Sequence, residues 1–340
     1  MTTTPDSVFK NAVEAGASDV HLAVGSPVLF RVDGVLAPQG KTPVTETELE
    51  RFIRTVLGEA NTKRLKETKE IDSAYQLKGG VRLRVNCHYE RGNMGLVARI
   101  VPTEIPTLED IGLATIAQSF IDQQEGLVLF TGPTGTGKST ALAAVINHIN
   151  QTKALSVVTL EDPIEFLFPE GRSVIRQRQL GEDFLSFPEA LKRVLRQDPN
   201  IVMVGEMRDP ETIAAALTLA ETGHLILATL HTPNALQTVD RIIDVFPPYQ
   251  QQQIRSQLSL SLKAVIAQRL LPREGGGRIA QREVLINTPA CANIIRDNRL
   301  PELKSVLQTG DSLGMVSFER DAKRLYKEGL ISKETYEAVG

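Results

Sequence analysis

The residues best suited to chemistry form the stretch GPTGTGKS, residues 132–139, which matches the phosphate-binding pattern G-x-x-x-x-G-K-[ST] in full. Its glycines allow successive backbone N–H groups to converge on phosphate oxygens, and the helix expected after it adds positive potential. Lys138 is suited to reach the β- and γ-phosphates, and Ser139 to bind Mg²⁺. We therefore expect ATP to bind through Gly132, Pro133, Thr134, Gly135, Thr136, Gly137, Lys138, Ser139 and Thr140.

Glu206 comes directly after Gly205 at the end of the apolar run NIVMV. Ligands of open α/β sheets bind outside the carboxyl ends of the strands, so we expect this carboxylate to face the phosphates. Because Gly205 stands where an aspartate is common, Glu206 is the candidate general base or water-orienting group, and a candidate Mg²⁺ ligand, directly or through water. The alternative is a helix-capping or surface glutamate, but Asp209-Pro210 already supplies the cap of the next helix.

Two more carboxylates, Glu161 and Asp162, end the strand-like part of VVTLEDPIEF, and Pro163 terminates the strand. A carboxylate near the same phosphates could hold the water shell of the metal, and we assign this role to Glu161. The alternative is a loop that only packs, since an acidic residue before proline is also ordinary turn chemistry.

His224 and His231 bracket the apolar run LILATL. In an extended strand they would lie about 23 Å apart, so they cannot share a metal ion. His231 lies at the end expected near the phosphates and could sense the γ-phosphate, whereas His224 lies at the far end. For each histidine, the alternative is capping of the strand.

A hydrolysis site also needs a mobile positive charge that neutralises the transition state. Arginines are abundant in VRLRVNCHYERGNMGLVARIV, residues 81–101, where Arg82 and Arg84 alternate onto one strand face. That face could simply be solvated. An arginine supplied to the nucleotide by this part of the same or a neighbouring subunit would explain why the N-terminal module is attached.

The elements that must position these residues follow from hydrophobic periodicity. After residue 113, short apolar runs alternate with helical segments, which predicts a parallel sheet with helices on both faces. Before residue 101, two hairpins, one turning at Asp33-Gly34, and a helix in TETELERFIRTVL indicate a small mixed α/β module. Pro102 and Pro106 mark a linker between them. The predicted divisions are 1–100, 101–113, 114–286 and a helical 287–340.

The composition is that of an ordinary globular protein: 340 residues, 41% hydrophobic and 23% charged, with a formal charge of -3. This charge gives no general attraction to nucleic acid, and the 5% aromatic content without tryptophan disfavours base stacking, so a DNA motor is the weaker hypothesis. No apolar run reaches the roughly 18 residues that span a bilayer, and no signal peptide is evident. We expect a cytoplasmic protein. Cys87 and Cys291 are expected to be buried and unpaired.

Taken together, these motifs resemble those of the secretion ATPases of type IV pilus and type II secretion systems. The phosphate loop, the acidic box VVTLEDPIEF, RQDPNIVMVGEMRDPET and the histidine box TGHLILATLHT occur in the order of that family, and residues 18–34 and 246–271 are also similar to it. The resemblance implies a PAS-like N-terminal α/β domain, a RecA-like P-loop ATPase domain and a helical C-terminal region. It also implies a homohexamer with nucleotide at the subunit boundaries.

The resemblance further implies roles for individual residues. Glu206 takes the role of the catalytic glutamate, Glu161 that of the acidic box, and His224 and His231 those of the histidine box. Arg84 and Arg99 align with the arginine fingers of the family.

Within the family the chain is most similar to the retraction motors of twitching motility. Their C-terminal hallmark AIRNLIRE reads ACANIIRD here, with Ala292 for arginine and Asp297 for glutamate. The implied function is ATP-driven pilus retraction through an inner-membrane platform protein, by a protein held at the membrane face by its partners and not inserted in the membrane. The alternatives are an accessory retraction ATPase or regulator acting with another pilus ATPase, and a pilus assembly or type II secretion ATPase.

Overall fold

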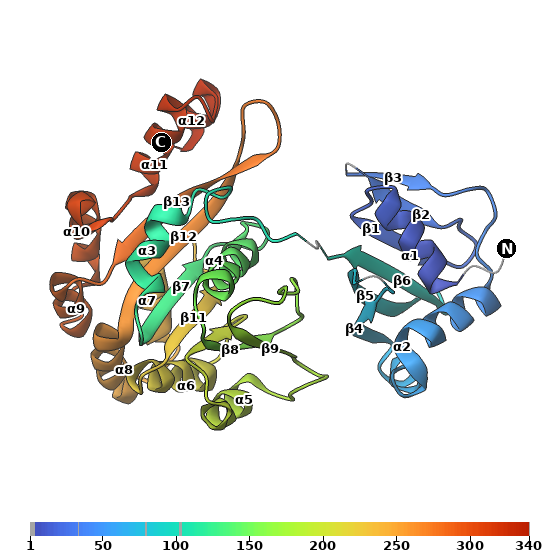
Figure 1. Cartoon of the computed structure of the whole chain (residues 1–340), viewed down its shortest axis with the longest axis horizontal. Coiled ribbons are helices and arrows are strands. Elements are labelled where there is room, and N and C mark those ends of the chain that lie inside the picture. Colours follow the sequence, from blue (N-terminus) through green and yellow to red (C-terminus); the bar gives the residue numbers. More distant parts are fainter. Residues whose placement is uncertain (1–3, 33, 79, 102–103, 340) are drawn as a thin grey trace. The chain divides into compact units, whose positions relative to one another are not determined.

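The computed structural model describes residues 4–32, 34–78, 80–101 and 104–339 (Figure 1). The chain divides into two compact units. The first comprises Met1–Glu104 and Glu165–Leu167, and the second comprises Ile105–Ile164 and Phe168–Gly340.

The first unit is a six-stranded antiparallel sheet in the order β3-β2-β1-β6-β5-β4, with two helices. Its elements are α1 (Pro5–Glu14), β1 (Asp19–Ala23), β2 (Leu29–Val32), β3 (Val35–Pro38), α2 (Glu46–Thr68), β4 (Glu70–Gln76), β5 (Arg82–Glu90) and β6 (Asn93–Ile100). Phe9 of α1, Ile53 of α2 and Leu83 of β5 are fully buried in one core. Both predicted hairpins are confirmed, as β2–β3 and β5–β6; Asp33 of the predicted turn lies outside the described residues.

The second unit is built on a seven-stranded sheet in the order β13-β12-β7-β11-β10-β8-β9. Its strands are β7 (Gly126–Thr131), β8 (Ser156–Glu161), β9 (Val174–Gln179), β10 (Ile201–Val204), β11 (Leu225–Leu230), β12 (Leu262–Pro272) and β13 (Arg278–Ile286). All neighbours pair in parallel except β12 and β13, which form an antiparallel pair at one edge. The predicted parallel sheet is thus confirmed, but the antiparallel edge strand was not predicted.

Helices cover both faces of this sheet, as the ribbon of the second unit shows (Figure 1). They are α3 (Ala114–Ile121), α4 (Lys138–Thr152), α5 (Phe187–Val194), α6 (Pro210–Glu221), α7 (Ala235–Asp244), α8 (Pro248–Ser261), α9 (Pro289–Arg296), α10 (Leu303–Thr309), α11 (Phe318–Lys327) and α12 (Lys333–Val339). Successive strand residues point to opposite faces, so Leu127 and Leu129 join a core with α5 to α10, and Val128 and Phe130 join one with α3 and α4.

The segment predicted as a linker, residues 101–113, contributes to the second unit from Ile105 onward. Leu108 and Leu113 are buried in the core that contains α3 and α4. Pro102 lies outside the described residues. The domain boundaries given above remain predictions. The two cysteines are free and buried, as expected.

Candidate functional site

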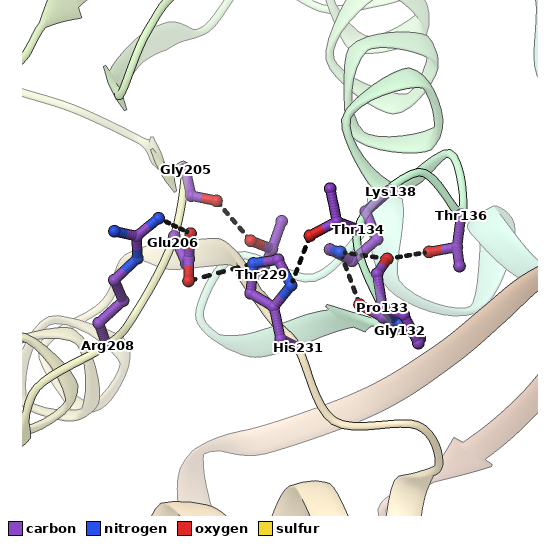
Figure 2. A network of polar contacts seen from close by, with 10 residues as sticks. All are labelled: Gly132, Pro133, Thr134, Thr136, Lys138, Gly205, Glu206, Arg208, Thr229 and His231. Carbon is purple, nitrogen blue, oxygen red and sulfur yellow. Dashed lines mark hydrogen bonds and ion pairs between the residues drawn. The ribbon is translucent and has the colours of Figure 1, made fainter.

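The phosphate loop connects β7 to α4, the strand–loop–helix setting that its sequence pattern requires. Gly132, Gly135 and Gly137 have positive φ angles of 142°, 82° and 86°, which residues with side chains rarely adopt. The Lys138 ammonium lies inside the loop and donates hydrogen bonds to the carbonyls of Gly132, at 2.6 Å, and Pro133, at 3.0 Å (Figure 2). The loop therefore has the backbone shape and the cation that phosphate binding needs.

Glu206 follows β10 and lies between two cationic or polar partners (Figure 2). Arg208 Nη2 donates to Glu206 Oε2 at 2.7 Å, and His231 Nε2 lies 3.1 Å from Glu206 Oε1. Burial by itself raises the pKa of Glu206, but the hydrogen bond from Arg208 and the charges of His231 and Arg208 outweigh it, so the pKa lies below its usual value. The carboxylate is therefore ionised at neutral pH and able to accept a hydrogen bond from water.

His231 connects Glu206 to the phosphate loop. Its Nε2 faces Glu206, and its Nδ1 lies 3.5 Å from the hydroxyl of Thr134 (Figure 2). His224 precedes β11 at the other end, where its Nδ1 lies 3.3 Å from the carbonyl of Leu219 at the end of α6. The structure thus brings His231 to the site and leaves His224 in a capping position remote from the loop.

The glycine before Glu206 has a steric explanation. The backbone N–H of Gly205 donates to the carbonyl of Leu160 in β8 at 2.7 Å, and the hydroxyl of Thr229 donates to the carbonyl of Gly205. A Cβ atom at this position would lie 3.1 Å from the Leu160 oxygen and 3.3 Å from Cα of Glu161. A side chain at this position, such as the aspartate that is common there, would therefore require the ends of β8 and β10 to move apart by a few tenths of an ångström.

Glu161 lies at the end of β8, where it is buried with 6% of its surface exposed. Its Oε1 accepts hydrogen bonds from the hydroxyl of Thr159, at 2.5 Å, and from Nε2 of Gln177, at 3.1 Å. These bonds hold the carboxylate against the side chains of β8 and β9. Glu161 is thus buried at the end of β8, whereas Glu206 and His231 are partly exposed.

Arg84 and Arg99 belong to the first unit, where they are directly opposite each other on β5 and β6 and share the exposed face. Arg99 Nε donates to Oδ1 of Asp19 at 2.8 Å, and 69% of the arginine side chain remains exposed. Arg84 forms no ion pair with any residue that the structure describes. Both guanidinium groups are accessible on this unit.

The described residues include no group of three or more His, Cys, Asp and Glu side chains that could hold a metal ion. Ser139, half-buried in the first turn of α4, offers a hydroxyl, and Glu206 offers a carboxylate. This donor set fits Mg²⁺, which is commonly held by few protein ligands together with substrate phosphates and water.

A cavity of about 590 Å³ adjoins the phosphate loop at Gly137 and Thr140. Its wall continues along Gly112, Arg278 and Arg282. The cavity thus lies beside the first turn of α4.

Two site residues were not found from the sequence, Arg208 and Gln268. Arg208 follows Glu206 at a spacing of two, which alone indicates no contact. Gln268 of β12 donates to the carbonyl of Thr136 in the phosphate loop at 2.6 Å, across 132 residues of sequence.

Residues 290–297, compared above with the retraction hallmark, fall in α9 and its C-cap. Cys291, Ile294 and Ile295 are buried, whereas Asn293 and Arg296 are exposed. Asp297, which replaces a glutamate of the hallmark, caps the helix and pairs with Arg299 at 3.4 Å.

The chain is similar to known proteins over most of its length. The family model described as "Type II/IV secretion system protein" matches residues 2–319. The chain is 43% identical to the type IV pilus retraction ATPase PilT of Pseudomonas aeruginosa, over 95% of this chain and 94% of that protein. It is 40% identical to the type IV pilus ATPase PilU of the same organism, over 97% and 86%.

A crystal structure of the pilus retraction motor PilT with bound ADP superposes with a TM-score of 0.92 and 40% identity, covering 99% of this chain and 97% of that one. This agreement confirms the expected fold class, an N-terminal α/β domain followed by a RecA-like ATPase domain. Among the described residues, no helix is both long and apolar enough to cross a membrane. By sequence and by structure, the chain belongs to the family of type II/IV secretion system proteins.

Proposed function

We propose that this chain hydrolyses ATP and uses the energy to drive retraction of a type IV pilus, the activity named for its 43% identical relative. The observation that supports this most is the contact series Glu206–His231–Thr134. It places an ionised carboxylate close to the phosphate-binding loop, where it can orient the water that attacks a phosphoanhydride.

In this proposal Lys138 moves from the loop carbonyls to the β- and γ-phosphates. Glu206 accepts a hydrogen bond from the attacking water and orients it, and His231 senses whether a γ-phosphate lies beside Thr134. Ser139 would hold Mg²⁺, with Glu206 reaching it through water; the ion supplies neutralisation of charge on the phosphate oxygens. The adenosine would occupy the cavity beside Gly137.

The motor is proposed to be a homohexamer. The second unit provides the phosphate loop and Glu206. Arg84 and Arg99, from the first unit of the same or a neighbouring subunit, would bring the positive charge that hydrolysis needs. An inner-membrane platform protein would receive the motion. An accessory retraction ATPase is the second candidate, favoured by the 40% identity to PilU and by Ala292 and Asp297 in the altered hallmark.

Steady-state ATP turnover at several protein concentrations tests the proposal, together with binding of a fluorescent ATP analogue. Lys138→Ala should lose binding, whereas Glu206→Gln should bind within about twofold of wild type but turn over about 100-fold or more slowly. Glu211→Gln, an exposed glutamate in the first turn of α6, is the matched control and should behave as wild type.

Turnover that rises more steeply than protein concentration would support a site completed between subunits. Equal turnover in Glu206→Gln and wild type would contradict the assignment of Glu206. Nucleotide binding without turnover at any protein concentration would favour the accessory candidate.

A further inference from the structure

Two glutamine–arginine pairs face each other across the antiparallel strands β12 and β13. Gln268 is opposite Arg282, and Arg269 is opposite Gln281. Because neighbouring residues of a strand point to opposite faces, the two pairs project on opposite sides of the hairpin. Both glutamines are buried, with 4% of Gln268 and none of Gln281 exposed.

The first pair contacts the phosphate loop. Gln268 Nε2 donates to the carbonyl of Thr136 at 2.6 Å. The loop glycines pack closely on the same residue: a Cβ atom at Gly132 would lie 2.3 Å from the Gln268 carbonyl oxygen, and one at Gly137 would lie 2.8 Å from Nε2 of its side chain. The loop is therefore seated directly on β12.

Arg282 fixes the orientation of the Gln268 amide. Its Nε donates to Oε1 of Gln268 at 2.9 Å, so the oxygen of the amide must face the arginine and the NH₂ group must face Thr136. The guanidinium of Arg282 is itself held, because it is buried and its Nη1 donates to the carbonyl of Gly112 at 3.1 Å. The backbone N–H of Arg282 donates to Oδ2 of Asp321 at 2.7 Å, which holds this part of β13 in place.

We propose that Gln268, oriented by Arg282, is a positioning residue for the phosphate loop. A peptide unit is planar and trans, so its C=O and N–H point in opposite directions. Holding the carbonyl of Thr136 toward β12 therefore directs the N–H of Gly137 away from β12. That N–H is the one that leads into α4, where the loop amides converge on phosphate. The inference rests on the proposed nucleotide site and adds a residue outside the loop that sets its shape.

Binding of a fluorescent ADP analogue, measured by titration, tests this proposal without requiring turnover. Gln268→Leu removes the donor to Thr136. Gln268→Glu keeps an acceptor for Arg282 but turns an oxygen toward the Thr136 carbonyl. Loss of one buried hydrogen bond corresponds to about tenfold in affinity, so both variants should bind about tenfold more weakly or worse.

Gln281→Leu is the matched control, because Gln281 belongs to the mirrored pair. It accepts a hydrogen bond from Arg269 and donates to the carbonyl of Phe318, with no contact to the phosphate loop. This variant should lower the urea midpoint as much as Gln268→Leu but bind the analogue within about twofold of wild type.

Arg282→Lys provides a second variant if the Gln268 variants fail to fold. It keeps the positive charge but loses the Nε donor, which frees the Gln268 amide to rotate, and we expect about threefold weaker binding.

The inference would be overturned if Gln268→Leu and Gln268→Glu fold and bind the analogue with wild-type affinity. If those two variants do not fold, wild-type affinity in Arg282→Lys would overturn it. So would an equal loss in Gln281→Leu, because the effect would then be general destabilisation. A wild-type chain that binds no nucleotide would refute the proposed function, and with it this inference. Tight wild-type binding with unaffected variants would refute the inference alone.

Discussion

Gly205 offers the sharpest test of how the strand ends hold Glu206, the proposed catalytic residue. Its φ angle is not in the left-handed region, so any cost of a side chain there comes from contacts and not from backbone strain. A Cβ atom would lie 3.1 Å from the Leu160 oxygen and 3.3 Å from Glu161 Cα, both of them backbone atoms of a buried strand end that cannot turn aside. In Gly205→Ala, the ends of β8 and β10 must therefore separate by a few tenths of an ångström.

The expected magnitude follows from this displacement. Adding a methyl group to a packed interior costs about 1–3 kcal/mol in the free energy of unfolding. Since a misplacement of 1 Å can cost about 100-fold in rate, a shift of a few tenths at the residue next to Glu206 should lower ATP turnover by about tenfold. Gly205→Asp should be worse, because it adds a second carboxylate beside the buried Glu161.

Urea unfolding and ATP turnover should be measured on the same preparations. Gly223→Ala is the control: Gly223 has a φ of 90° with open space around the position of a Cβ atom, so its cost of about 1 kcal/mol arises from backbone strain remote from Glu206. It should lower the urea midpoint but leave turnover unchanged. If Gly205→Ala retains both the wild-type urea midpoint and wild-type turnover, the closeness of the β8 backbone does not explain why position 205 is a glycine.

Two further predictions concern the histidines and the first unit. His231→Ala should lower turnover by about tenfold or more, because it removes the ring between Glu206 and the phosphate loop. His224→Ala should leave affinity for the ATP analogue unchanged, since His224 lies at the other end of β11, and a loss of affinity in His224→Ala or wild-type turnover in His231→Ala would contradict this distinction. Burial raises the pKa of Asp19, but hydrogen bonds from Arg99 and Ser18 and the charge of Arg99 bring it below 3.8. The ionised carboxylate therefore stabilises the folded unit above about pH 4 and loses this contribution as pH falls through the lowered pKa. Asp19→Asn should accordingly lower the free energy of unfolding at pH 7, measured with urea, by about 1 kcal/mol or less since Arg99 is exposed, and the difference from wild type should shrink below pH 4.

The sequence was informative where the determinants are local. The strand, glycine loop and helix around Lys138 follow one another within a few residues, so the pattern could be interpreted without tertiary contacts. The placement of Glu206 and His231 at one edge needed only a general property of parallel sheets, that their strands end on the same side. His224 was expected at the opposite end for the same reason, and the structure places it there.

Contacts between distant segments could not be obtained in this way. Asp19 and Arg99 are 80 residues apart in sequence, and their pairing depends on the order of β1 and β6 in the sheet. The antiparallel edge formed by β12 and β13 was missed because polar and charged residues, such as Gln268-Arg269 and Gln281-Arg282, interrupt the apolar pattern of both strands. Arg208 was missed because its contact with Glu206 depends on how the loop after β10 turns, which side-chain spacing does not determine.

The strand order explains why the supports of the phosphate loop are so far apart in sequence. The loop follows β7, and β7 lies between β11 and β12. His231, after β11, reaches the hydroxyl of Thr134, and Gln268, in β12, reaches the carbonyl of Thr136. The two contacts lie on either side of Gly135, the residue between them, whose positive φ leaves little freedom to substitute it. A relative movement of β11 and β12 would therefore change the loop from both sides at once. In the proposed site, this movement would be a physical route by which the γ-phosphate end and the β12–β13 hairpin influence the same few peptide units.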